Sequence, residues 1–213
     1  MLTQEGDTVH GTVEADNEPR AIEQAARIVS LDHDGTAYPE VGERDPIVGE
    51  LQRSSGYLRP VLFHSPYEAA AWSVISARAG HAQAVKLRDA LGETFPPPHK
   101  LLRLQELQGL PANKIPRLHG IAQAALEGKL DREPLLAKDP DVAYTELQEL
   151  PGIGPFYAGL ILIRAVGTTD VLAKGEPRLE NAVQARYGRP IADVAELWRP
   201  FRTWISVLMR ANA

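Results

Sequence analysis

The sequence predicts a mainly α-helical protein with a small α+β segment at its N-terminus. From residue 65 onward, apolar residues recur at helical spacing between proline and glycine breaks, the pattern of successive packed helices. Alternating β-branched residues, the pattern of a strand, occur at residues 7–15. With 213 residues, of which 44% are hydrophobic and 24% charged, the chain has the size and composition of a soluble globular domain with a smaller piece attached.

The α+β segment is predicted to cover residues 1–55. Residues 7–15 predict one or two short strands, and residues 18–31 predict a helix with a proline at its start. Residues 33–49 contain an Asp-Gly pair and two prolines, and predict a loop with a short helical turn near Pro46. One strand pair and one helix cannot enclose a core, so this segment is expected to pack on the rest of the chain.

The helical domain is predicted to cover residues 56–213. Its first helix begins at a capping box, in which Ser65 is the N-cap, Pro66 takes the first helical position and Glu68 the third. Helices are expected over residues 65–79, 81–91, 99–107, 111–127, 139–149, 155–166, 177–187 and 193–211. The last helix has one broad apolar face, formed by Trp198, Phe201, Trp204, Ile205 and Leu208.

The most informative stretch is the Pro-Gly-Ile-Gly turn between two of these helices. Pro151 cannot continue a helix, Gly152 and Gly154 permit a sharp reversal, and Pro155 suits the first turn of the next helix. This pattern predicts a helix-hairpin-helix. The exposed N–H groups at the positive end of its second helix suit a phosphate, although the same turn can also serve only to connect packed helices.

Charge and composition narrow the function classes. The net charge of −5 is unevenly spread, because residues 1–55 carry 4 basic and 12 acidic side chains whereas residues 56–213 carry 19 and 16. The helical part is therefore mildly basic, which permits salt-dependent binding of nucleic acid. The absence of cysteine excludes disulfides, thiolate catalysis and a Cys-ligated iron–sulfur cluster. No apolar run approaches membrane-span length and no signal segment is recognisable, so a cytoplasmic protein is expected.

Acidic residues follow the hairpin within a short distance. Asp170 and Glu176 lie in the loop 167–176, between the second hairpin helix and the next helix. A carboxylate at a helix start usually caps that helix. A carboxylate beside a phosphate held by the hairpin has a second use, because it can stabilise a cationic sugar transition state or orient a water at C1′.

Together these segments carry a resemblance to a known family. The segment LQELPGIGPFYAGLILIRAVGTTDVL, the glutamate that follows it and the terminal ELWRPFRTWISVL resemble the helix-hairpin-helix DNA glycosylase superfamily, and most closely the 3-methyladenine DNA glycosylase II (alkylbase glycosylase) family. Residues 65–91 resemble the first large helix pair of that family. The resemblance covers roughly residues 55–213, so the chain resembles a member shortened at its N-terminus.

The resemblance implies a monofunctional enzyme of base excision repair that flips a damaged nucleotide and hydrolyses its N-glycosidic bond. Its implied partner is double-stranded DNA containing a damaged base, with no membrane association and a monomeric state. In this family, hairpin amides hold a phosphate beside the lesion, which implies DNA contacts at Gly152, Ile153, Gly154 and Phe156. Hairpin carbonyls bind a sodium or potassium ion, which implies Gln148, Leu150 and Ile153 as its ligands; no other cofactor is implied.

Four positions depart from the family pattern or modify it. Phe156 replaces the lysine of the lyase branch, so no Schiff base is expected and Phe156 is assigned to the base pocket. The catalytic aspartate corresponds to Glu176, with Asp170 as the second candidate for the acid. Arg78 takes the place of the residue that wedges into the duplex, where an arginine can fill the gap and contact phosphate or can equally be an ordinary surface residue. Arg210 takes the place of a pocket tryptophan.

Trp204 matches a further aromatic position of the family, and either the core or the base pocket can accommodate it. Three functions therefore remain open from the sequence: a DNA glycosylase for alkylated or otherwise damaged purines, a damaged-DNA-binding protein of the same fold that has lost efficient chemistry, and a helical protein–protein module.

Overall fold

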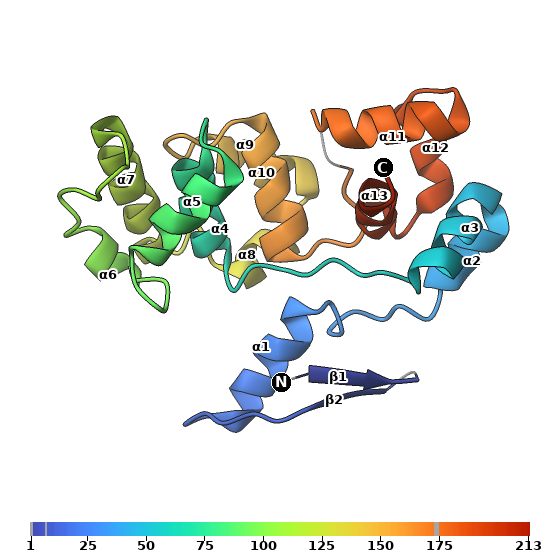
Figure 1. Cartoon of the computed structure of the whole chain (residues 1–213), viewed down its shortest axis with the longest axis horizontal. Helices are drawn as coiled ribbons and strands as arrows, with labels where there is room; N and C mark the ends of the chain where they lie inside the picture. Colours follow the sequence, from blue (N-terminus) through green and yellow to red (C-terminus); the bar gives the residue numbers. More distant parts are fainter. Residues whose placement is uncertain (1, 7, 173–174) are drawn as a thin grey trace.

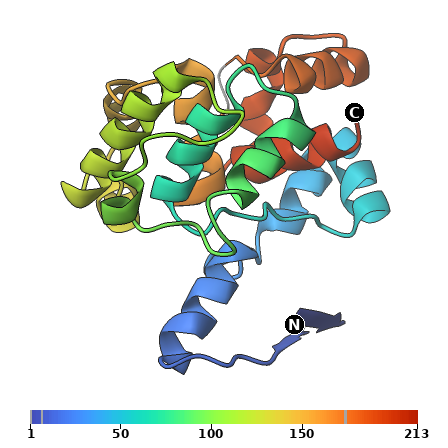
Figure 2. The ribbon, with the colours of Figure 1, turned by 60° about the vertical axis from the view of Figure 1, so that its left-hand side comes forward.

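The computed structural model describes residues 2–6, 8–172 and 175–213 and confirms the mainly α-helical class (Figure 1). The described strands are β1 (Leu2–Glu5) and β2 (Thr8–Gly11), which pair antiparallel with Leu2 opposite Gly11. The strand pair precedes α1 (Glu18–Ile28), and Figure 2 shows both projecting from one side of the helical body. None of the described helices is long and apolar enough to span a membrane.

The helical body has two apolar cores. The first core is built by α4 (Pro66–Ser76), α5 (His81–Asp89), α6 (Pro98–Leu101), α7 (Ile115–Leu126), α8 (Arg132–Ala137), α9 (Pro140–Gln148), α10 (Pro155–Ile161) and the π-helical turn η2 (Leu162–Val166), with the 3-10 turn η1 (Ala112–Lys114) leading into α7. The second core is built by α2 (Tyr38–Arg44), α3 (Pro46–Ser55), α11 (Pro177–Tyr187), α12 (Ile191–Val194), η3 (Ala195–Trp198) and α13 (Arg202–Ala211). The two helical groups lie side by side in Figure 1.

The predicted helical turn near Pro46 is confirmed as the start of α3, but the loop predicted for the rest of residues 33–49 is wrong, because α2 lies there. The prolines that suggested a loop occupy the first turns of the two helices, where proline is tolerated. The two glycines let the helices touch: a Cβ on Gly42 would lie 2.7 Å from the Gly49 Cα, and a Cβ on Gly49 would lie 2.6 Å from the Gly42 carbonyl oxygen. Because α2 and α3 share the second core with the C-terminal helices, the boundary at residue 55 stays a prediction that this packing does not favour.

Three other parts of the helical domain differ from the prediction. The helix expected at 99–107 is shorter, since α6 covers Pro98–Leu101, and α8 was not expected. The helix expected at 193–211 is divided, with η3 ending at Trp198 and α13 beginning after Pro200. The interruption agrees with the steric cost of a proline inside a helix.

The irregular segment 61–64, in the connection between α3 and α4, forms hydrogen bonds to α1 on one side and to η2 on the other. The Leu62 amide donates to the Ile28 carbonyl at 2.7 Å, and the Phe63 amide donates to the Arg164 carbonyl at 2.6 Å. The buried Arg27 guanidinium donates to the carbonyls of Phe63, His64 and Ala165. Helix α1 therefore ties the connection to the first core, as expected for a front segment that cannot fold by itself.

Asp45 is the buried polar anchor of the second core, with 2% of its surface exposed. One carboxylate oxygen caps α3 by accepting from the amides of Ile47 (3.1 Å) and Val48 (3.3 Å). The other accepts from the Tyr187 hydroxyl at 2.7 Å and the Trp198 Nε1 at 3.1 Å. Burial raises the pKa of the Tyr187 hydroxyl, which keeps it a donor. One carboxylate thus joins α3 to α11 and η3.

We expect Asp45→Ala to lower the free energy of unfolding by roughly 3 kcal/mol, because several buried donors lose their acceptor at once. Urea unfolding followed by tryptophan fluorescence measures this change. Asp34→Ala is the control, since Asp34 is exposed and, among the described residues, hydrogen-bonds only to Thr36 in its own turn. Equal unfolding midpoints for the two variants would contradict the assignment of Asp45 as an anchor.

Candidate active site

The Pro-Gly-Ile-Gly turn forms the hairpin between α9 and α10 and is seated on two other helices. Gly152 has φ +85°, and a Cβ there would lie 3.1 Å from the Arg117 Cδ of α7 and 3.5 Å from a Val74 methyl group of α4. A Cβ on Gly120 of α7 would lie 2.6 Å from Pro151. Two positions without side chains therefore let the hairpin sit directly on the first core.

The hairpin amides divide into two kinds. Within the described residues, the amides of Gly152, Gly154 and Phe156 donate no hydrogen bond, and Gly154 is the N-cap of α10. The Ile153 amide instead donates to the Leu150 carbonyl at 3.0 Å, and its side chain is buried. Three of the four predicted DNA contacts therefore have an available donor. The amide of Ile153 is already used inside the turn.

The predicted ion site concerns backbone carbonyls in the same turn. Of the three predicted ligands, the Leu150 carbonyl already accepts from Ile153, and the carbonyls of Gln148 and Ile153 accept no backbone bond outside the helices within the described chain. No group of three or more His, Asp or Glu side chains in the described residues is placed to hold a metal ion. The monovalent cation stays a prediction.

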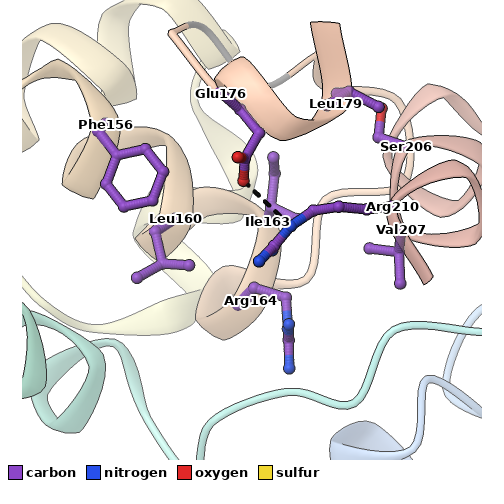
Figure 3. Close-up of a pocket in the computed structure, with 9 residues that line it drawn as sticks. All are labelled: Phe156, Leu160, Ile163, Arg164, Glu176, Leu179, Ser206, Val207 and Arg210. Carbon is purple, nitrogen blue, oxygen red and sulfur yellow. Dashed lines mark ion pairs between the residues drawn. The ribbon is translucent and has the colours of Figure 1, made fainter. Parts of the chain in front are cut away.

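Glu176 is the N-cap of α11 and points into a cavity (Figure 3). Its Oε1 accepts from the Arg178 amide at 3.3 Å, and its Oε2 lies 3.3 Å from the Arg210 Nε of α13. The Glu176 side chain is 12% exposed and the Arg210 side chain 41% exposed. Oε1 therefore caps α11, while Oε2 faces Arg210 across the cavity.

The cavity beside Glu176 lies between the two cores. It has a volume of about 50 Å³, which gives room for a few waters, since one water needs roughly 10–15 Å³. Its lining comes from both sides and consists of Phe156, Leu160, Ile163, Arg164, Glu176, Leu179, Ser206, Val207 and Arg210. A second cavity of about 430 Å³ shares Leu160, Arg164 and Arg210 with it and is otherwise lined by Phe63, Glu68, Trp72, His81, Arg88 and Phe95. These two neighbouring cavities are together called the cleft below.

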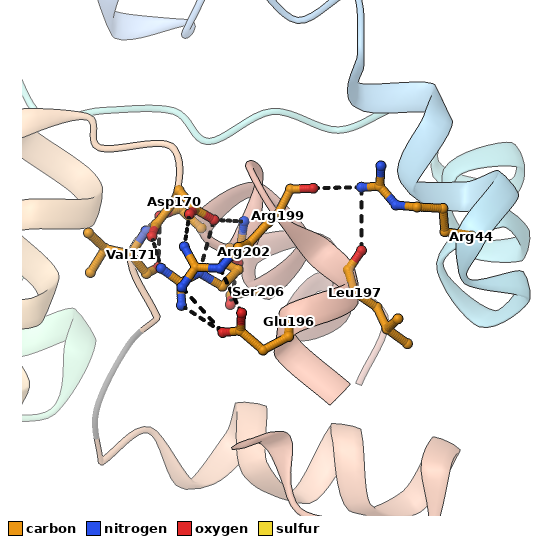
Figure 4. Close-up of polar contacts among 9 residues, drawn as sticks. Arg44, Asp170, Val171, Glu196, Leu197, Arg199, Arg202 and Ser206 are labelled. Atoms are coloured by element: carbon orange, nitrogen blue, oxygen red, sulfur yellow. Dashed lines mark hydrogen bonds and ion pairs between the residues drawn. The ribbon is translucent and has the colours of Figure 1, made fainter. Parts of the chain in front are cut away.

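Asp170, the second candidate for the acid, lies outside this cleft. Its carboxylate accepts hydrogen bonds from Arg199 Nη1 at 2.6 Å, from Arg202 Nε at 2.9 Å and from the Arg202 amide at 3.2 Å (Figure 4). Glu196 completes the network by accepting from both arginines. Asp170 thus fixes the loop to the start of α13.

Trp204 also lies outside the cleft, and its assignment to a base pocket is not supported. The side chain is 1% exposed and packs in the second core against Tyr38, with ring centroids 5.1 Å apart, and against Phe201, at 4.9 Å. The Arg59 guanidinium covers its ring at 4.8 Å. Of the three predicted pocket residues, Phe156 and Arg210 line the cavity.

Arg78 lies in the exposed turn between α4 and α5 with φ +57°, which is unusual for a residue with a side chain. The buried Lys114 holds this turn, because its Nζ donates to the carbonyls of Ile75 at 2.8 Å and Ala77 at 2.7 Å. Burial lowers the pKa of the Lys114 ammonium, and the charge of Arg117 lowers it further. The sequence analysis missed Lys114, because nothing local in the sequence shows which carbonyls it reaches.

A signal for the missed cavity residues was present in the sequence. Leu160 and Ile163 follow the predicted Phe156 at spacings of four and three residues and so share its helix face, and Val207 lies three residues before the predicted Arg210 on one face of α13. Which two faces meet across the cleft depends on tertiary packing.

Comparisons with known proteins agree with this architecture. No family model matches the chain. The DNA-3-methyladenine glycosylase of Bacillus subtilis (strain 168) is 28% identical to this chain, over 89% of this chain and 73% of the relative. The DNA-3-methyladenine glycosylase 2 of Escherichia coli (strain K12) is 25% identical, over 92% of this chain and 74% of the relative. The structure of a Schizosaccharomyces pombe 3-methyladenine DNA glycosylase in complex with abasic DNA has the same fold, with a TM-score of 0.63, 19% identity and coverage of 88% of this chain and 95% of that chain. These matches confirm the resemblance to the helix-hairpin-helix DNA glycosylases, closest to the 3-methyladenine DNA glycosylase II family.

The two hairpin glycines should respond differently to substitution. Gly152→Ala is expected to lower the free energy of unfolding by about 1 kcal/mol or more, because a side chain is disfavoured at positive φ and would press on Arg117. Gly154→Ala is the matched control, since Gly154 has φ −94° and a Cβ there meets no atom within 4 Å. Thermal unfolding of both variants tests the difference, and an unchanged midpoint for Gly152→Ala would refute the requirement for glycine.

Proposed function

We propose that this protein is a monofunctional DNA glycosylase of base excision repair, which hydrolyses the N-glycosidic bond of alkylated or otherwise damaged purines after the nucleotide is flipped out of the duplex. The observation that carries this proposal is the position of Glu176. Its carboxylate faces a cavity that is also lined by Phe156, from the first turn of the hairpin helix. A phosphate held by the hairpin would therefore place the adjoining nucleotide beside a carboxylate.

The chemistry follows from a carboxylate that faces the cavity. As the bond between C1′ and the base breaks, positive charge develops on the sugar, and the Glu176 carboxylate stabilises that charge. The same carboxylate accepts a proton from the water that attacks C1′. Phe156 offers an aromatic face for the flipped base and supplies no amine, so hydrolysis without a lyase step is expected.

Glutamate is one methylene longer than the family aspartate, so the contacts of its carboxylate decide where the carboxylate lies. The carboxylate is held at one oxygen by the Arg178 amide and at the other by Arg210. Both contacts orient the group toward the cavity. Arg210 is partly exposed, which leaves it able to shift when a sugar enters beside Glu176.

The DNA contacts we propose lie on the hairpin and on the α4–α5 turn. The amides of Gly152, Gly154 and Phe156 would hold a phosphate, and a sodium or potassium ion on the carbonyls of Gln148, Leu150 and Ile153 would increase the positive potential there. Arg78 would enter the gap left by the flipped nucleotide, with Lys114 fixing the turn that presents it. We propose a monomer that acts on chromosomal DNA in the cytoplasm.

Glu176→Gln is expected to lower the single-turnover rate of base release by about 10²- to 10⁴-fold, because the amide neither accepts the proton nor carries the charge. Oligonucleotides containing hypoxanthine or 7-methylguanine are suitable substrates. Glu180→Gln is the matched control, since Glu180 is exposed on the same helix, and it should retain the wild-type rate. Equal rates for wild type and Glu176→Gln would remove Glu176 from the mechanism.

The ion pair between Glu176 and Arg210 favours one alternative, a protein that binds damaged DNA without efficient chemistry. This alternative predicts salt-sensitive DNA binding and no base release by the wild-type protein from a broad panel of lesions. Release of any base above the spontaneous rate, dependent on Glu176, decides for the enzyme.

Arg78→Ala is expected to weaken DNA binding and to reduce the slope of log affinity against log salt by about 1, if the guanidinium contacts a phosphate. Fluorescence anisotropy at several salt concentrations measures both quantities. Arg103→Ala is the control, because Arg103 is equally exposed but follows α6, away from the hairpin. The same loss of affinity in both variants would argue against a specific role for Arg78.

A further inference from the structure

We infer that the cleft favours a neutral 6-oxopurine, such as hypoxanthine, over a cationic methylated purine. This inference rests on the proposed glycosylase function and specifies the leaving base. It follows from the charges that line the cleft and from the hydrogen-bond donors that they leave unused.

Two arginines and one carboxylate line the smaller cavity. Arg210 extends from α13 toward Glu176, the sole carboxylate of the lining, whereas the Arg164 side chain, from η2, points away from Glu176 in Figure 3. The carboxylate is 3.3 Å from Arg210, so its charge is already matched. In the adjoining cavity, Glu68 and Arg88 form a second pair at 3.5 Å. Arg88 also pairs at 3.2 Å with the exposed Asp89, which lies outside the lining. Among the residues that line the two cavities, three arginines exceed two carboxylates by one positive charge, and Arg164 carries the charge that no carboxylate matches.

The Arg164 charge has no acidic partner within the described chain. Its Nε donates to the Val61 carbonyl at 2.8 Å, which is a neutral acceptor. Burial lowers the pKa of the Arg164 guanidinium, and the positive charge of Arg210 lowers it further. Since an arginine stays protonated in proteins, a cationic base would enter a site with an excess of positive charge.

The Arg210 guanidinium has donors to spare. Its Nε faces Glu176, whereas its two terminal nitrogens make no hydrogen bond with any described residue. A planar guanidinium binds the O6 and N7 acceptors of a 6-oxopurine in a bidentate manner. Methylation at N7 removes one of these acceptors and adds a positive charge. The same contact is therefore favourable for hypoxanthine and unfavourable for 7-methylguanine.

The chemistry of the leaving group agrees with this preference. When the C1′–N9 bond of a neutral purine breaks, its electron pair goes to the purine, which leaves as an anion. The water oxygen bonds to C1′, one water proton passes to Glu176, and the purine takes up a proton from solvent. A guanidinium beside the purine stabilises the anionic charge as it develops. A methylated cationic purine leaves as a neutral molecule and gains nothing from that charge.

The experiment compares single-turnover release of hypoxanthine and of 7-methylguanine from otherwise identical duplexes. Each rate is divided by the spontaneous rate of loss of the same base, because methylation at N7 weakens the glycosidic bond by itself. The wild-type enhancement should be larger for hypoxanthine. Arg210→Leu should reduce the enhancement for hypoxanthine about 5- to 150-fold more than that for 7-methylguanine, because loss of the contact with Glu176 affects both bases whereas loss of the bidentate contact affects hypoxanthine alone.

Two further variants make the comparison specific. Arg210→Lys keeps the charge but loses the planar pair of donors, so it should fall between wild type and Arg210→Leu on hypoxanthine. Arg189→Leu removes an exposed arginine that follows α11, outside the lining of either cavity, and should change neither rate.

A larger wild-type enhancement for 7-methylguanine, or an equal loss on both bases in Arg210→Leu, would overturn the inference and leave the glycosylase proposal intact. Failure of the glycosylase proposal is distinct, because then neither base would be released above its spontaneous rate. Thermal unfolding midpoints close to wild type in the Arg210 variants confirm that the rates report on the cleft.

Discussion

The geometry of the cleft depends on how the irregular segment 61–64 is held between the two cores. Its amides and carbonyls bond to α1 on one side and to η2 on the other, partly through the guanidinium groups of Arg27 and Arg164. Arg164 also lines both cavities. The residue that fixes the connection between the cores therefore also sets the charge at their junction. A substitution in this segment would therefore shift Arg164 and alter the cleft without changing Glu176 itself.

Much of the fold was predictable because its determinants are local. The capping box at Ser65 and the hairpin glycines specify their own conformations, and the structure has a helix start and a turn at those places. The α2–α3 pair was missed because the close approach of Gly42 and Gly49 is a tertiary contact, whereas prolines and glycines in sequence suggest a loop. The division of the last helix at Pro200 was predictable, because proline is disfavoured inside a helix. The prediction of one continuous helix instead followed the broad apolar face of that segment.

The site was predictable in its parts and not in its arrangement. Phe156, Glu176 and Arg210 were each identified from the sequence, and the structure brings them to one cavity. Trp204 was the ambiguous case, since an aromatic residue on an apolar helix face suits a core and a pocket equally, and contact with Tyr38 decides for the core. The pairing of Glu176 with Arg210 could not be predicted, because the two residues are brought together only when α11 and α13 pack in the second core.

The two cores differ in how their residues are distributed along the chain, and this difference bears on the order of folding. The first core draws on residues 69–166, one continuous stretch of the chain. The second combines residues 38–51 with residues 179–209, so its formation must close a loop that contains the whole first core. Closing a long loop costs less entropy once the intervening chain is compact, and contacts distant in sequence form slowly. During synthesis, α2 and α3 would therefore wait for α13 to leave the ribosome, and the cleft would be the last part of the molecule to acquire its shape.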